Sequence, residues 1–137
     1  MEANSGILSG EVGQVTSWRV VATDDDPKLL DQIVIALRDA GHCVFAAYDG
    51  NSACELALII PDLDLLVTNT RMGTVSAIEL IRSVREKKPH LPILHVGEPL
   101  QDEDGLLRDV PNLREPFTAA QLLDQAAALV ARGRPTS

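Results

Sequence analysis

The chain has 137 residues with 45% hydrophobic content, which suits one globular domain with its own core. Its formal net charge of −8 argues against direct binding to nucleic acid or to an anionic membrane, because both require a basic surface. The amino terminus lacks the basic start and the long apolar stretch of a secretory signal, and we therefore expect a cytoplasmic protein.

The two ends of the chain differ in composition from its middle. Residues 1–16 are rich in Gly and Ser and show little periodicity, so we expect a flexible N-terminal segment. Residues 17–132 carry the periodic patterns of a folded domain, and residues 133–137 form a short polar C-terminal tail. Because no second domain follows residue 132, we expect a stand-alone module that acts by association.

The first half of the domain alternates strand and helix patterns. Residues 18–23 are an apolar, β-branched run that predicts a buried strand, and three acids follow it. The helix after these acids has Asp26 as its cap and Pro27 in its first turn, and it ends before Gly41. The remaining elements of this half are a strand over 43–48, a turn at residues 49–51 that begins with Asp49, a helix over 52–60 and a strand over 63–69.

The second half repeats the alternation up to one weak stretch. Ser76 and Glu79 form the capping-box pattern of a helix, and residues 92–97 predict the next buried strand. Residues 98–110 are acidic and poorly periodic, and they predict at most a short helix. The closing elements are a short strand within residues 111–117 and a helix capped by Thr118 with Gln121.

The reactive and aromatic side chains of this pattern are assigned to packing. Cys43 and Cys54 lie in apolar patterns without metal-ligand spacing, so we expect buried, reduced thiols. Trp18, Tyr48 and Phe117 are expected in the core or at its edge. No histidine lies on an amphipathic helix, as a phosphotransfer histidine would.

Strands that alternate with helices predict a doubly wound α/β fold, with helices on both faces of a parallel sheet. In such folds, binding and chemistry collect at the carboxyl ends of the strands, the edge that we call the carboxyl rim. The side chains expected there are those of Asp24, Asp25, Asn69 and Glu115, together with Gly97, which has none.

Five short motifs in this order resemble the receiver domain of two-component response regulators. They are TDDDP after the first strand, YDGNSACELA across the second strand and its helix, DLLVTNTRM at the third strand, PILHVG at the fourth and REPF at the fifth. The resemblance implies a flavodoxin-like (CheY-like) five-stranded parallel sheet with strand order 2-1-3-4-5. The stretch from Gly97 to Glu115 is shorter than usual in that family by about one helical turn, which implies a shortened fourth helix.

The resemblance also implies a role for each position of the carboxyl rim. Acids after the first strand bind a divalent metal such as Mg²⁺ in that family; Asp24 and Asp25 match them, and Asp25 would be the direct ligand. Asn69 occupies the position of the phosphoacceptor aspartate. Gly97 replaces the usual Thr or Ser, and Glu115 replaces the lysine before the proline.

These replacements predict a degenerate pseudo-receiver. Asn69 offers no ionised carboxylate oxygen, so an acyl phosphate cannot form there. Gly97 has no hydroxyl to bond a phosphoryl oxygen, and Glu115 would repel an anion that the lysine would attract. We therefore expect that residue 69 cannot be phosphorylated.

The charges of Asp24, Asp25 and Glu115 at this rim leave four interpretations open. Either the rim binds a hard cation such as Mg²⁺, or the like charges raise a pKa so that one carboxyl stays protonated. Arg71 or Arg114 could instead supply a salt bridge. The last interpretation is a structural role for the acids, because acids at strand ends often only cap the following helix.

The resulting expectation is a non-enzymatic signalling module of the two-component or phosphorelay type that acts by protein–protein interaction. Its expected partners are signalling proteins such as a histidine kinase or another regulator, with the chain a monomer or weak dimer. One alternative is phosphorylation of Thr68 or Thr70. The other is a small flavodoxin-like ligand-binding or nucleotide-binding protein, although the chain lacks a Gly-rich phosphate loop.

Overall fold

Five short strands form one parallel sheet, and helices connect the first four of them in chain order. The computed structural model describes residues 17–69, 76–101 and 104–133. The elements in chain order are β2 (Arg19–Thr23), α2 (Pro27–Asp39), β3 (Cys43–Ala47), α3 (Gly50–Ile59), β4 (Leu65–Asn69), α4 (Ala77–Lys87), β5 (Ile93–Val96), β6 (Asn112–Leu113) and α5 (Ala119–Gly133). The strands are hydrogen-bonded in the order β3-β2-β4-β5-β6, which confirms the predicted fold and strand order.

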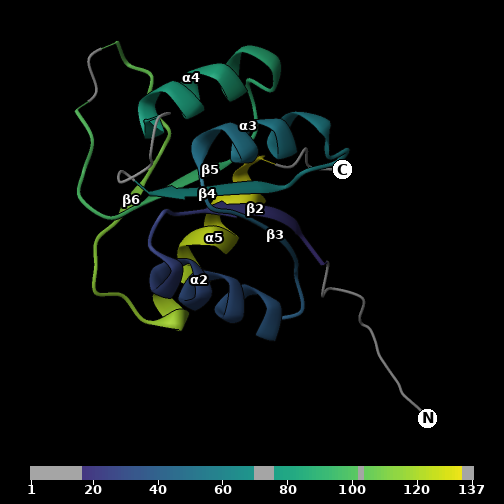
Figure 1. Ribbon diagram of the computed structural model, residues 1–137, viewed down its shortest axis with the longest axis vertical. Coiled ribbons are helices and arrows are strands. Elements are labelled where there is room, and N and C mark those ends of the chain that lie inside the picture. The colour runs from purple at the N-terminus through teal and green to yellow at the C-terminus, as the bar shows by residue number, and fades with distance from the viewer. Residues whose placement is uncertain (1–16, 70–75, 102–103, 134–137) are drawn as a thin grey trace.

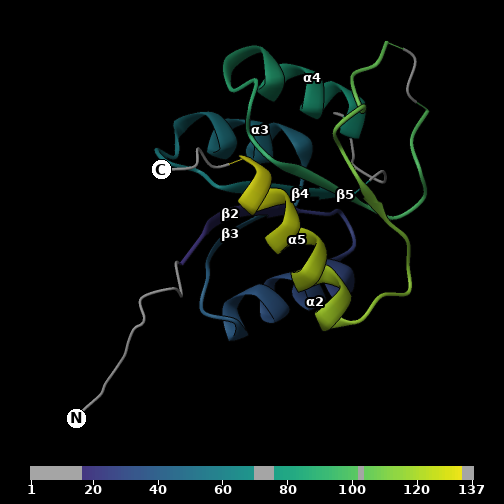
Figure 2. The same ribbon diagram turned by 180° about the vertical axis from the view of Figure 1, so that it is seen from behind.

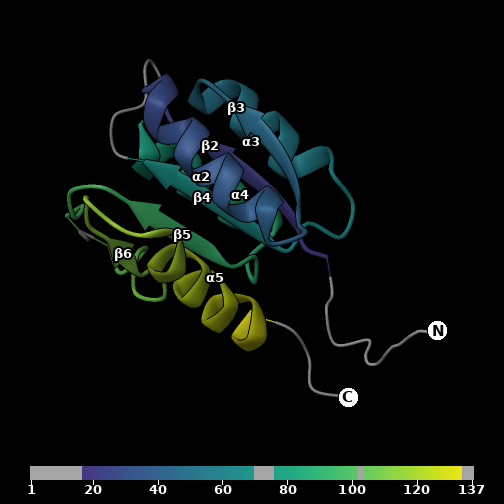
Figure 3. The same cartoon turned by 90° about the horizontal axis from the view of Figure 1, so that it is seen from below.

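The sheet is the middle layer of three. Helices α3 and α4 cover one face, and α2 and α5 cover the other (Figure 1). Seen from behind, α5 runs across the sheet towards α2, and the view from below shows these two helices over the same face (Figures 2 and 3). Because strand side chains alternate, Val20 and Ala22 join the core under α2 and α5, whereas Val21 joins the core under α3 and α4.

Side-chain caps fix the starts of the helices. Asp26 accepts a hydrogen bond from the backbone of Lys28, and the predicted capping boxes at Ser76 and Thr118 are both formed. Helix α3 begins earlier than predicted, because the Asp49 carboxylate accepts a 2.7 Å hydrogen bond from the backbone of Ser52. The turn expected at this join is therefore the first turn of α3.

In its described residues, the crossover between β5 and β6 lacks the shortened fourth helix that we expected. Its described residues contain bends and turns but no helix, so the shortening is more complete than predicted. Two ion pairs hold this segment against α4: Arg82 to Asp104 at 3.6 Å and Arg85 to Asp109 at 3.0 Å. Leucines 106 and 107 and Val110 of the segment pack against the core beneath it.

Three expectations at the surface and termini need correction. Cys43 is exposed rather than buried because it opens the edge strand β3, and Cys54 is only partly buried; both are free thiols. Tyr48 is 59% exposed and does not pack in the core. Helix α5 ends at Gly133, one residue past the predicted boundary, and the N-terminal segment 1–16 lies outside the described residues. Among those residues, no helix has the length and hydropathy that crossing a membrane needs.

Candidate functional site at the carboxyl rim

Asp24 and Asn69 are in direct contact at the carboxyl rim. Asp24 follows the last residue of β2, and Asn69 is the last residue of β4, the strand paired with β2. Both side chains are fully buried, and Asn69 Nδ2 donates a 2.8 Å hydrogen bond to Asp24 Oδ2. Since an ionised carboxylate only accepts hydrogen bonds, the amide nitrogen is the group that can face it at this distance.

The second oxygen of Asp24 is also occupied. Asp24 Oδ1 accepts a 2.8 Å hydrogen bond from the backbone N–H of Asp26, so both carboxylate oxygens have internal donors. Burial raises the pKa of Asp24 from 3.8 to about 6, against the lowering effect of these two hydrogen bonds. Crowding by Asp25 and Asp26 contributes less than burial does. The raised pKa that the sequence suggested is therefore present, but desolvation is its main cause.

Gly97 faces Asn69 from the end of β5. Its φ of 117° lies in the region that favours glycine, and its backbone N–H donates a 2.9 Å hydrogen bond to the carbonyl of Leu113. A Cβ atom at this position would lie 3.3 Å from Asn69 Oδ1. The absence of a side chain at residue 97 thus gives the amide of Asn69 its space.

A buried polar network next to Gly97 was missed by the sequence analysis. Asn112 Nδ2 donates a 2.9 Å hydrogen bond to the carbonyl of Gly97, which leaves Asn112 Oδ1 to face Nδ1 of His95. His95 is 2% exposed, and its Nε2 has no hydrogen-bond partner among the described residues. The only sequence signal was the pairing of a histidine in a buried strand with an asparagine in the next strand.

His95 makes folding stability depend on pH. Burial lowers its pKa from 6.5, so its contribution to stability is complete above pH 6.5 and is lost as the pH falls through the lowered value. We expect His95→Gln to reduce the loss of unfolding free energy below pH 6.5, by up to about 1.4 kcal/mol per pH unit. Urea denaturation at pH values above and below 6.5 measures this change in unfolding free energy. His90→Gln, at an exposed histidine, is the control. If the unfolding free energy of wild type and of His95→Gln changed equally with pH, His95 would not be the source of the pH dependence.

The remaining candidate residues lie further out. Asp25 and Glu115 are both exposed, and Glu115 precedes Pro116 through a cis peptide bond. Arg114 pairs with Glu98 at 3.6 Å, whereas Arg71 and Thr70 lie outside the described residues. Thr68 is fully buried within β4, which does not suit a residue that must meet a phosphodonor.

Within the described residues, a magnesium ion at this rim would have to compete with the hydrogen bonds of Asp24. Within residues 17–69, 76–101 and 104–133, no group of three or more His, Cys, Asp or Glu side chains is placed to hold a metal. Asp24 already has a donor on each oxygen, and Asn69 turns N–H groups rather than its carbonyl towards it. Magnesium needs several oxygen ligands in near-octahedral geometry, so these hydrogen bonds would have to break first.

Comparison with known proteins finds sequence similarity to bacterial response regulators and transcriptional regulatory proteins. No family model matches the sequence. It is 31% identical over 124 residues to the response regulator MprA of Mycobacterium leprae, covering 85% of this chain and 53% of that protein. The chain spans about half the length of the curated relatives it matches.

Solved structures give the same result at the level of fold. The chemotaxis response regulator CheY4 of Vibrio cholerae superposes with a TM-score of 0.73 at 25% identity, covering 83% of this chain and 99% of that one. The receiver domain of the sensor histidine kinase PA1611 of Pseudomonas aeruginosa, solved with magnesium in its active-site cleft, gives 0.73 at 20% identity, with 85% and 99% covered. The chain therefore has the fold of CheY-like receiver domains and a sequence similar to that of a response regulator.

Proposed function

We propose that this chain is a receiver-type module of two-component signalling that is not phosphorylated on residue 69 and acts by binding other signalling proteins. The observation that carries the proposal is the buried hydrogen bond from Asn69 Nδ2 to Asp24 Oδ2. In this arrangement, the acceptor position is occupied by an amide whose N–H already has a partner. The module would then be neither an enzyme nor a phosphate-driven switch.

Chemistry at residue 69 supports this proposal. Phosphoryl transfer to a receiver domain needs a carboxylate oxygen that attacks phosphorus and stays bonded to it. The nitrogen of a carboxamide is a poor nucleophile because its lone pair is delocalised into the carbonyl group. In Asn69 this nitrogen also directs a hydrogen atom at Asp24, so no nucleophilic atom of the amide faces an incoming phosphodonor from that side.

The neighbouring positions point the same way. Gly97 brings no hydroxyl to a phosphoryl oxygen, and Glu115 places a carboxyl group where a cation would balance the phosphate charge. Electrostatic stabilisation of the transferred group is the main protein contribution in phosphoryl transfer, and these positions do not supply it. The proposed partners, a histidine kinase or another regulator, would recognise a surface whose shape does not depend on phosphate.

An intact-mass experiment tests the proposal. The protein is incubated with Mg²⁺ and acetyl phosphate, and its mass is followed over time. We expect no added phosphoryl mass on the wild type, and only slow, partial labelling of Asn69→Asp, because Gly97 and Glu115 remain. Phosphorylation of wild-type residue 69 would overturn the proposal. Labelling that persists in Asn69→Ala would instead locate an acceptor elsewhere, such as Thr68 or Thr70.

A further inference from the structure

Two cavities lie at the amino ends of β4 and β5, the opposite edge of the sheet from Asp24 and Asn69. Their volumes are about 340 Å³ and 320 Å³, and both are lined by the segment from His90 to Pro92 and by Gly133. The first is flanked by groups that are already paired: Lys88 Nζ donates to two carbonyls at the end of α3, and Asp64 accepts from the backbone of Arg19.

The second cavity has an unbalanced positive charge. Its lining includes Arg85, His90 and Arg132, with Asp109 as the only acid among the lining residues. In the described part of the chain, the side chains of His90 and Arg132 have no hydrogen-bond or ion-pair partner. The two arginines of the lining outnumber its one aspartate, and this local balance favours an anion over a cation.

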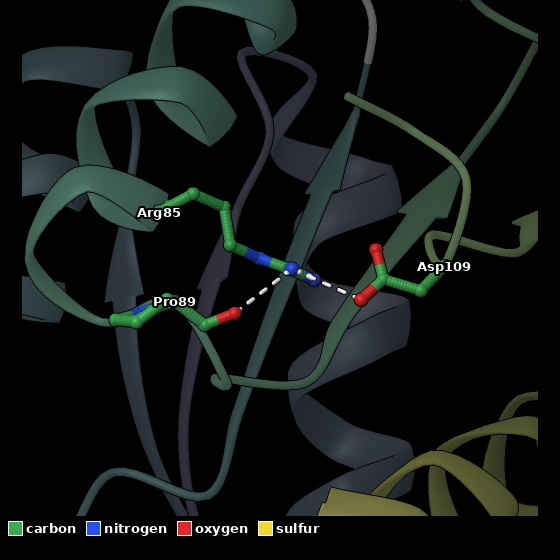
Figure 4. Close-up of polar contacts among 3 residues, drawn as sticks. All are labelled: Arg85, Pro89 and Asp109. Atoms are coloured by element: carbon green, nitrogen blue, oxygen red, sulfur yellow. Dashed lines mark hydrogen bonds and ion pairs between the residues drawn. The ribbon is translucent and has the colours of Figure 1, made fainter. Parts of the chain in front are cut away.

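Arg85 is the best-positioned cation of this cavity. Its guanidinium lies between the Pro89 carbonyl and Asp109, with Nη1 at 3.1 Å and 3.0 Å from their oxygens (Figure 4). The side chain is 15% exposed, and its buried Nε has no hydrogen-bond partner in the part of the chain that the structure describes. Asp109 is itself 66% exposed, so this single-point contact leaves the charge of Arg85 only partly compensated.

We infer that this second cavity binds a small organic carboxylate. The partly compensated charge of the Arg85 guanidinium attracts a carboxylate, and Arg132 adds a second positive charge at the cavity wall. Leu91, Pro92 and Leu129 supply an apolar wall for the body of the ligand. The volume of about 320 Å³ lies at the lower end of small-molecule sites, which fits a carboxylate on one ring or a short chain.

NMR titration of the full chain tests this inference with 3-phenylpropionate as the probe. Backbone amides and the Arg85 Nε–H signal are followed at constant ionic strength. We expect saturable shifts confined to the region of Arg85, His90 and Leu129, with a Kd of about 1 to 5 mM for a ligand of this size. The neutral isostere 3-phenylpropionamide should give no saturable shifts there, because it carries no charge for the two arginines.

Two matched variants separate the site from general electrostatics. Arg132→Gln removes an exposed charge at the cavity and should weaken binding about 5-fold. Arg82→Gln removes a charge from the same helix as Arg85 but outside the cavity lining, and should leave the Kd unchanged. The inference is overturned by the absence of saturable shifts, by equal binding of the amide, by equal binding of inorganic phosphate, or by equal weakening in both variants.

Discussion

Asn69→Asp should lower the free energy of unfolding by about 3 kcal/mol at pH 8 without divalent cations, the largest effect that we expect from a single rim substitution. The 2.8 Å hydrogen bond from Asn69 to Asp24 would become a contact between two buried carboxylates. Neither can donate a hydrogen bond when ionised, and their charges repel each other in a poorly solvated site. Urea denaturation with a linear extrapolation measures the change.

The pH dependence of Asn69→Asp and a double variant serve as its controls. At pH 5 the two carboxyls can share a proton, and Mg²⁺ can bridge them at pH 8, so either condition should recover part of the loss. The double variant Asp24→Asn with Asn69→Asp exchanges the amide and the carboxylate and should recover most of it. Unchanged stability of Asn69→Asp at pH 8 would show that the amide is not what satisfies Asp24.

Gly97→Thr is expected to cost about 2 to 3 kcal/mol of unfolding free energy. The φ of 117° at this position is strained for any L side chain and most of all for a β-branched one. The new Cβ would also lie 3.3 Å from Asn69 Oδ1, so restoring a hydroxyl at residue 97 disturbs the amide. Thermal and urea denaturation of Gly97→Ala would give the cost of adding a Cβ atom. The same measurements on Gly97→Thr would give the further cost of a β-branched side chain.

A double-mutant cycle separates the cost of the strained φ at residue 97 from the cost of the contact with Asn69. Asn69→Ala removes the side chain that the new Cβ would meet, but it leaves the backbone strain at residue 97 in place. If the contact matters, Gly97→Thr should cost less in the Asn69→Ala background than in the wild type. Identical costs in both backgrounds would show that the two positions are independent.

Together, these contacts link the side chain at residue 69 to the glycine at residue 97. An amide at residue 69 occupies space next to Gly97, and it also supplies the donor that the buried Asp24 needs. A cation or a proton would otherwise have to balance the carboxylate, because a buried charge without a partner is costly. At this rim a buried acidic side chain is therefore satisfied by a neutral one.

The strands, helices and caps could be predicted from sequence because their causes are local. The apolar runs, the side-chain caps such as Asp26 and Ser76, and the alternation of strand and helix all lie within short windows. The same local signals explain the errors. Asp49 was assigned to a turn although it caps α3, and Cys43 was placed in the core although its strand lies at the sheet edge.

The candidate site could be predicted only as a set of positions. The topology of a doubly wound sheet places Asp24, Asn69 and Gly97 at one edge, and this prediction is confirmed. Which atoms pair depends on side-chain directions set by packing between strands far apart in sequence. The bond between residues 24 and 69 and the network of His95 with Asn112 therefore needed the structure.

The most direct test of the account is a Mg²⁺ titration of the wild-type protein, followed through the side-chain NH₂ signals of Asn69 and the carboxyl carbon of Asp24. We predict that both stay unchanged up to about 10 mM Mg²⁺, because the amide already satisfies the carboxylate. A saturable shift of both signals in the low millimolar range would show that a cation displaces the amide. That result would contradict the central claim that Asn69 takes the place of a cation at this rim.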